Sequence, residues 1–196
     1  MKRRAERQDE TRRRIVEAAI VLHGSVGMNK TTVKQIAELA GVGRQTVYRH
    51  FADELALGRA CSGLYFERNP LPDPESWKKV ADPEDRARVA LRESYAFHRK
   101  TETMIGLAIA DVGESPIMEP YFEHWRRAAD IVASAWGNHG DEREGALSKA
   151  AIGHALAFQT WRNLVRDQGL TDDQAVELML RFVAATRNPR KTRTGG

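Results

Sequence analysis

Cysteine is nearly absent from this chain, since Cys61 is the only one. A single thiol excludes an intrachain disulfide framework and is typical of proteins in a reducing compartment. No run of 18 apolar residues occurs, so we expect no transmembrane helix and no membrane partner. The first residues, MKRRAERQDETRRR, lack the apolar segment of a secretory signal. The sequence therefore predicts a cytoplasmic protein.

Sequence motifs of common enzyme classes are also missing. We find no Gly-rich phosphate loop, no Ser or Cys nucleophile in a recognisable setting and no paired-carboxylate motif. His98, His124 and His154 do not stand at metal-ligand spacing with cysteines or acidic residues. We therefore expect no catalytic residues, no metal site and no cofactor.

Positive charge is concentrated at one end of the sequence. Residues 1–50 contain 11 Lys and Arg against 5 Asp and Glu, whereas residues 51–196 contain 20 against 22. A polyanion, either nucleic acid or a membrane surface, would be attracted to such a basic end. The alternative reading of the same charges is a solvated basic tail.

Helical signals dominate, because no stretch alternates convincingly between apolar and polar residues. We predict an all-α fold of about nine helices in all. An N-terminal three-helix helix-turn-helix domain with a basic arm occupies residues 1–53, and a larger helical domain occupies residues 54–188. Residues 54–67 form the connecting helix, and residues 189–196 form a disordered basic tail. The proline-rich stretch NPLPDPES (residues 69–76) is a loop near the boundary.

Caps and helix breakers give the expected helix limits. The first helix runs from about residue 10 to residue 25. Asp82 and Pro83 are an N-cap and a first helical residue, and they begin a helix that ends near residue 98 or 99. A shorter apolar helix, TETMIGLAIAD, follows it. Residues 142–167 are expected to form one long helix that is rich in small side chains.

The last helix is predicted to have two apolar faces. Thr171 and Gln174 match a capping box at its start. Val176, Met179, Leu180 and Val183 form one stripe, while Ala175, Leu178 and Phe182 form another. One face can pack on the helix's own domain and the other on a partner, for which a second copy of the chain is the simplest candidate. We therefore expect a homodimer formed through the last two helices.

The stretch TTVKQIAELAGVGRQTVYRHF predicts two short amphipathic helices joined by a glycine turn. Thr32 and Gln35 match a capping box, and Gly41 stands where a helix commonly ends in a left-handed conformation. Ala37, Gly41 and Val47 have the A-x3-G-x5-V spacing, which lets one helix cross another closely and pins the second helix down. The pattern indicates a helix-turn-helix.

Helical phase separates the side chains of the second helix. At about 100° per residue, Val47 and Phe51 face inward while Gln45 and Arg49 face outward. Gln and Arg can bond base edges bidentately, and the other polar residues suit base or phosphate contacts. An ordinary polar solvent face is the alternative. The candidate DNA-binding residues are Thr31, Thr32, Arg44, Gln45, Thr46, Tyr48, Arg49 and His50, with Arg3 and Arg4 of the basic arm, which would follow a minor groove or phosphates.

This stretch, preceded by HGSVGMNK, resembles the DNA-binding domain of the TetR family of bacterial transcriptional regulators. The usual pattern there is TT-x-x-x-IA-x-x-AGVS-x-x-T-x-Y-x-x-F, and the resemblance covers about residues 10–60. Three residues depart from the family. Gly43 stands where Ser usually caps the second helix, and Glu54 stands where a Lys commonly touches phosphate. His23 occupies a position that is usually a core aromatic.

The resemblance implies a homodimeric repressor that binds a palindromic double-stranded DNA operator and is released by a small-molecule effector of unknown identity. The effector would occupy the helical domain. Two alternatives remain, namely an architectural DNA-binding protein without an effector and a helical enzyme that uses the same cavity. The candidate ligand-binding residues are large side chains on the surrounding helices, each of which could instead be core packing: Tyr95, His98, Met104, Phe122, Trp125, Phe158 and Trp161.

Overall fold

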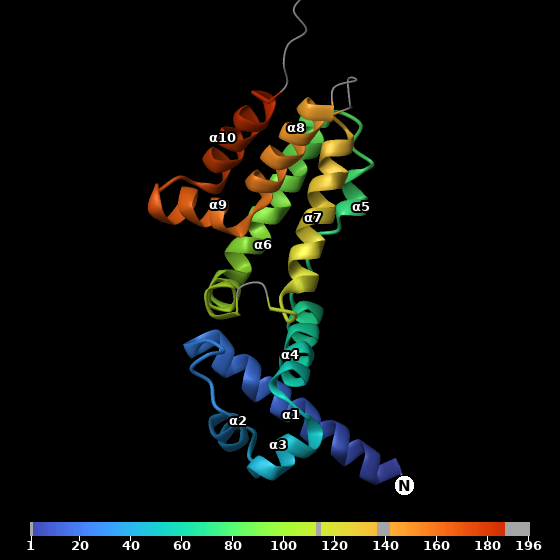
Figure 1. Cartoon of the computed structure of the whole chain (residues 1–196), viewed down its shortest axis with the longest axis vertical. Helices are drawn as coiled ribbons and strands as arrows, with labels where there is room; N and C mark the ends of the chain where they lie inside the picture. The colour runs from blue at the N-terminus through green and yellow to red at the C-terminus, as the bar shows by residue number, and fades with distance from the viewer. Residues whose placement is uncertain (1, 113–114, 137–141, 187–196) are drawn as a thin grey trace, which may run out of the picture. The chain divides into compact units, whose positions relative to one another are not determined.

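The computed structural model describes residues 2–112, 115–136 and 142–186 (Figure 1). Every regular element in these ranges is a helix, which confirms the predicted all-α class. The predicted basic tail of residues 189–196 lies outside the described residues.

The chain forms two compact units, and each contains two stretches of sequence. The first unit consists of Met1–Leu71 with Thr101–Tyr121, and the second of Pro72–Lys100 with Phe122–Gly196. Each unit is described by itself below.

The first unit is built on four helices: α1 (Lys2–Val26), α2 (Val33–Ala40), α3 (Arg44–His50) and α4 (Glu54–Arg68). Helix α1 packs on the other three. Leu57 and Cys61 of α4 are buried in the same core as Val47 of α3. This compact unit therefore extends beyond the predicted domain of residues 1–53, because the apolar face of α4 completes its core.

Helix α1 begins at Lys2, so the expected start near residue 10 was wrong. Nothing in the first residues breaks a helix, and Arg13 pairs with Glu10 and Glu17, at 2.9 Å in each case, one turn away on either side. Arg3 and Arg4 consequently lie exposed on a helix and do not form an extended arm.

The second unit contains the remaining helices. The two units divide α6 between them, because its residues from Thr101 onward belong to the first unit. The first three residues of α7 also belong to the first unit. The helices are α5 (Pro74–Trp77), α6 (Pro83–Val112), α7 (Glu119–Ser134), α8 (Glu142–Leu156), α9 (Phe158–Arg162), a π-helical turn (Asn163–Asp167) and α10 (Asp172–Ala184).

Two predicted helix limits differ from the structure. Helix α6 continues through the expected end near residue 98 or 99, because residues 99–105 contain neither Gly nor Pro, and it also passes through Gly106. The predicted long helix of residues 142–167 is instead broken at Ala157, whose backbone is extended (φ −69°, ψ 139°). The break leaves the last carbonyls of α8 without helical partners, and those of Ala155 and Leu156 accept hydrogen bonds from α6 side chains.

Helix α10 begins with the predicted capping box, in which the Thr171 side chain accepts from the Gln174 amide at 3.2 Å. Its first apolar stripe is buried as expected, and Ala175 joins that buried face instead of the second stripe. Leu178 and Phe182 are exposed at 43% and 44%. An outward apolar face therefore exists on α10, and it is narrower than predicted.

Candidate functional site

Hydrogen-bonded caps fix both ends of α2, and the cap at its C-terminal end forms the turn to α3. The Thr32 hydroxyl accepts from the Gln35 backbone amide at 3.2 Å, and Oε1 of the Gln35 side chain accepts from the Thr32 backbone amide at 2.8 Å. Gly41 has φ +63°, a left-handed conformation that favours glycine, and the amide of the next residue donates to the Ala37 carbonyl at 3.0 Å. The predicted capping box and glycine turn are confirmed.

Helix α3 is held by two buried side chains and presents polar ones outward. Val47 and Phe51 are 2% and 3% exposed. Gly43 forms the N-cap without a side-chain hydrogen bond, as its lack of a hydroxyl predicts. Tyr48 is 59% exposed, so an aromatic ring stands on the surface between polar neighbours. The backbone thus displays one face of α3 to a partner.

The structure gathers most of the candidate DNA-binding residues on this small surface. Arg44, Gln45, Tyr48 and Arg49 are exposed, while Thr46 and His50 are half-buried. Thr31 and Thr32 precede α2, where the Thr31 hydroxyl donates to the Gly27 carbonyl at 2.7 Å and Thr32 forms the cap. Arg3 and Arg4 are exposed on the first turns of α1.

Two arginines of α1 position the helix-turn-helix, a role that sequence reasoning missed. The Arg14 guanidinium donates to the carbonyls of Ala40 and Gly41, with Nε to Ala40 O and Nη2 to Gly41 O both at 3.1 Å. These are carbonyls at the C-terminal end of α2. The Arg12 guanidinium lies over the Phe51 ring at 4.7 Å. The sequence marks both residues only as positive charge, because their partners are far away in the chain.

Five of the predicted ligand-binding residues pack on one another in the second unit. His98 is the centre, with ring centroids 4.9 Å from Trp125, 5.6 Å from Phe158 and 5.9 Å from Trp161. The Tyr95 hydroxyl donates to the Ala155 carbonyl at 3.0 Å. Phe122 is half-buried. These side chains form a dense aromatic cluster around a fully buried imidazole.

The imidazole of His98 has one unsatisfied nitrogen in the described structure. Nε2 donates to the Leu156 carbonyl at 2.9 Å, which leaves Nδ1 as a buried acceptor without a partner. Burial lowers the pKa of His98 to about 4, with the hydrogen bond to Leu156 acting in the opposite direction. The ring is therefore neutral near pH 7.

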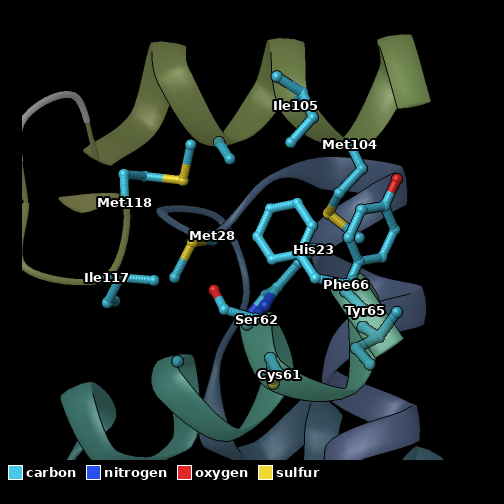
Figure 2. Close-up of a pocket in the computed structure, with 13 residues that line it drawn as sticks. His23, Met28, Cys61, Ser62, Tyr65, Phe66, Met104, Ile105, Ile117 and Met118 are labelled. Atoms are coloured by element: carbon cyan, nitrogen blue, oxygen red, sulfur yellow. The ribbon is translucent and has the colours of Figure 1, made fainter. Parts of the chain in front are cut away.

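Met104, the remaining predicted ligand-binding residue, lines a different cavity, within the first unit. This cavity has a volume of about 40 Å³. Figure 2 shows side chains from α1, the loop that follows α1, α4, α6 and the segment that precedes α7 reaching into it. Its walls are mainly apolar, and three of the five methionines of the chain contribute to them: Met28, Met104 and Met118.

The polar residues that line this cavity include His23, Ser62 and Tyr65, and the first two lie beside each other in Figure 2. Burial lowers the pKa of His23, and the carboxylate of Asp111 opposes that shift. Cys61 also lines the cavity, but burial raises the pKa of its thiol to about 12, so it stays protonated. The cavity is thus an apolar space with a neutral polar corner.

No cluster of three or more His, Cys, Asp or Glu residues able to hold a metal ion occurs among the described residues. In that same part of the chain, none of the helices is both long and apolar enough to span a membrane.

Known proteins resemble the chain at two levels. The family of bacterial regulatory proteins named tetR matches residues 15–60. The HTH-type transcriptional regulator SrpR of Pseudomonas putida is 39% identical over 80 residues, a match that covers 37% of this chain and 37% of that protein. The similarity to SrpR thus spans well under half of either chain.

Solved structures resemble it over a greater length at lower identity. NalD, described as the secondary repressor of the MexAB-OprM multidrug efflux pump in Pseudomonas aeruginosa, has 18% identity and a TM-score of 0.59, covering 92% of this chain and 97% of NalD. The multidrug binding protein EbrR, in complex with imidazole, has 21% identity and a TM-score of 0.56, covering 92% of each chain. At these identities the likeness concerns the fold, which extends the similarity to both units.

Proposed function

Through residues 15–60 the chain belongs to the TetR family of bacterial regulatory proteins, and we propose that it is a homodimeric repressor released from its operator by a small molecule. The observation that carries the proposal is the outward face of α3. Gln45, Tyr48 and Arg49 are exposed on a helix whose inner side is fixed by buried residues. This arrangement supports insertion of α3 into a major groove.

Base and phosphate contacts divide among these side chains by their chemistry. Gln45 and Arg49 can form bidentate hydrogen bonds with base edges, whereas Tyr48 and the start of α2 suit phosphate oxygens. Arg3 and Arg4 lie on a helical turn, so they would contact phosphates from a rigid position. Glu54 is exposed in the first turn of α4, and its carboxylate contributes no attraction to phosphate.

A second copy of the chain would cover the outward face of the last helices. Leu178 and Phe182 of α10 are exposed together with Leu147 of α8, at 53%. Helices α8 and α10 pack on each other, so these apolar side chains belong to neighbouring helices of one unit. Exposed apolar groups of this kind favour a protein partner, and a homodimer would pair two reading helices with two half-sites of a palindrome.

Effector binding would act by favouring a form of the dimer that fits the operator poorly. Such coupling requires different affinities of the effector for the two forms. A coupling free energy of about 1–3 kcal/mol would lower operator affinity about 5- to 150-fold. The unsatisfied Nδ1 of His98 supports a ligand with a donor group in the second unit, and the cavity at Met104 supports an apolar one in the first.

Sequence selection from random DNA with the purified chain tests the proposal. We expect enrichment of one pseudo-palindromic sequence whose half-sites lie about one helical turn apart or somewhat more. Binding that falls steeply with salt while no sequence is enriched would overturn the repressor and favour an architectural DNA-binding protein.

A further inference from the structure

We propose that the methionine-lined cavity of the first unit is an effector site for small uncharged apolar molecules that carry one hydrogen-bonding group. The claim that the ligand regulates DNA binding rests on the proposed repressor function. The claim that the ligand binds in the cavity does not, since that binding can be measured without DNA. The proposed site does not include the aromatic cluster around His98, which belongs to the second unit.

The chemistry of the walls selects the ligand class. Met28, Met104 and Met118 offer flexible, polarisable side chains that adapt to ligands of different shape. Among the described residues no charged side chain lines the space, so an ion would lose its hydration without compensation. His23, Ser62 and Tyr65 bring polar groups, and in the described structure none of these side chains hydrogen bonds to another residue. A hydroxyl on the ligand could use any one of them.

The size of the cavity explains why binding would change the structure. Its volume is about 40 Å³, well below the roughly 150 Å³ of an engineered apolar cavity that binds benzene. A monocyclic ring is larger and must displace side chains. The closed form therefore excludes such a ligand, and only a widened form binds it. That difference in affinity is what an effector requires.

Close helix contacts around the cavity resist widening and would transmit it. A Cβ atom at Gly58 of α4 would lie 2.5 Å from Ile117 Cδ1, and one at Gly24 of α1 would lie 3.1 Å from Met104 Cε. The backbones of α1 and α4 are thus in close van der Waals contact with side chains from the opposite wall of the cavity. A ligand would push α6 and the segment before α7 away from α1 and α4.

The C-terminal end of α6 is hydrogen-bonded to the loop that precedes α2. The Asn29 amide donates to Asp111 Oδ2 at 3.1 Å, and the Asn29 side-chain amide donates to the Asp111 carbonyl at 3.0 Å. Gly27 lies against the same carboxylate, since a Cβ there would be 2.3 Å from Oδ2. Displacement of α6 would therefore move the loop that begins the helix-turn-helix.

Binding is tested by NMR of the full chain carrying ¹³C-methyl methionine, with phenol as the probe and toluene as its isosteric partner without a hydroxyl. We expect phenol to shift the signals of Met28, Met104 and Met118 in a saturable way, while Met179, buried in the second unit, stays in place. After correction for the different free energies of transfer of the two molecules from water to an apolar solvent, toluene should bind at least fivefold more weakly than phenol. Shifts absent from all three cavity methionines, or equal shifts at Met179, would overturn the site.

Cavity-filling variants supply the control. Ala108 lines the cavity and is 8% exposed, whereas Ala110 lies two residues further along α6 and is exposed. Ala108→Leu should abolish the phenol shifts, and Ala110→Leu should keep them. Ala108→Val, a smaller addition, replaces Ala108→Leu if the latter fails to fold. Unchanged phenol binding in a folded Ala108 variant would place the ligand elsewhere and overturn the assignment.

Regulation is tested by fluorescence anisotropy on the selected operator. Saturating phenol should weaken operator binding at least fivefold for the wild type and Ala110→Leu, and less than twofold for the folded Ala108 variant. Phenol that shifts the methionine signals but leaves operator affinity unchanged would refute the effector role. If no operator can be selected, the repressor proposal fails, and the NMR result still decides the cavity.

Discussion

The carboxylate of Asp172 joins α10 to α6 and α9, and its removal gives the sharpest stability prediction. Arg99 donates to it through Nε at 2.7 Å and Nη2 at 2.8 Å, and Trp161 donates through Nε1 at 3.0 Å. The hydrogen bond from Arg99 is the main cause of the lowered pKa of Asp172. The Trp161 ring is fully buried, so removal of the carboxylate takes away the one acceptor of its N–H in the described structure.

The magnitude follows from these three bonds. The ion pair is partly exposed, with 45% of the Arg99 and 33% of the Asp172 side chain accessible, and contributes about 0.5–1 kcal/mol. A buried N–H left without an acceptor costs about 1–3 kcal/mol. We therefore expect Asp172→Ala to lower the free energy of unfolding of the second unit by about 2–3 kcal/mol. Asp172→Asn keeps an oxygen for Trp161 and should cost about half as much.

Asp173→Ala is the matched control, because Asp173 has the same charge and the same place in the first turn of α10. Its side chain is 83% exposed and approaches Arg92 only at 3.6 Å. Any effect through the helix dipole is common to both substitutions, so Asp173→Ala should cost less than about 1 kcal/mol.

Urea unfolding at pH 7 followed by tryptophan fluorescence measures the difference. All four tryptophans, at positions 77, 125, 136 and 161, lie in the second unit, so the signal reports that unit. Equal losses for Asp172→Ala and Asp173→Ala would refute the reasoning, because the contacts of Asp172 would then have no measurable value.

Three further predictions concern the core, the dimer and the pH response. Val47→Ala removes two buried methyl groups, so it should lower the free energy of unfolding by about 2 kcal/mol, measured by circular dichroism, and weaken binding to every DNA. The control Val21→Ala changes a side chain that is 60% exposed and should lower the free energy of unfolding by under about 0.5 kcal/mol. The double variant Leu178→Glu/Phe182→Glu should sediment as a monomer, whereas the control Val21→Glu should sediment as a dimer. If the double variant remains a dimer, the exposed face of α10 is not the dimer interface. The pKa of His98 is lowered to about 4 when folded, so the unfolded chain binds the extra proton below its ordinary pKa near 6.5. Unfolding free energy should therefore fall by about 1.4 kcal/mol per pH unit from about pH 6 to 4, and His98→Gln should reduce this slope by that amount; an unchanged slope would contradict the buried neutral ring.

Local backbone chemistry was the part of the fold that could be predicted from sequence. Both capping boxes, at Thr32 and Thr171, and the left-handed Gly41 occur as predicted because each depends on residues within one turn. The cap of α4 is equally local, since the Asp53 side chain accepts from the Ala56 amide at 2.7 Å. The break at Ala157 carries no Gly or Pro and is stabilised by distant α6 side chains, so no local signal marks it.

The candidate site divides in the same way. The outward face of α3 follows from helical phase, which depends only on spacing. The roles of Arg12 and Arg14 depend on contacts with α3 and α2 that the sequence does not encode locally. The cavity is made by residues from five segments, and of the predicted ligand-binding set only Met104 lines it. From the sequence we predict that aromatic side chains line the pocket, whereas in the structure most of them pack around His98.

The most direct test of the central claim is the ratio of operator affinity to unrelated-DNA affinity in Gln45→Ala, with Gln159→Ala as control. Both glutamines are exposed on helices, and only Gln45 lies on α3. Loss of a bidentate base contact, about 1–3 kcal/mol, should reduce this ratio about 5- to 150-fold while binding to unrelated DNA stays unchanged. Gln159→Ala should keep the wild-type ratio. A ratio that is unchanged in Gln45→Ala, or an equal loss on both DNAs, would contradict base reading by this face of α3.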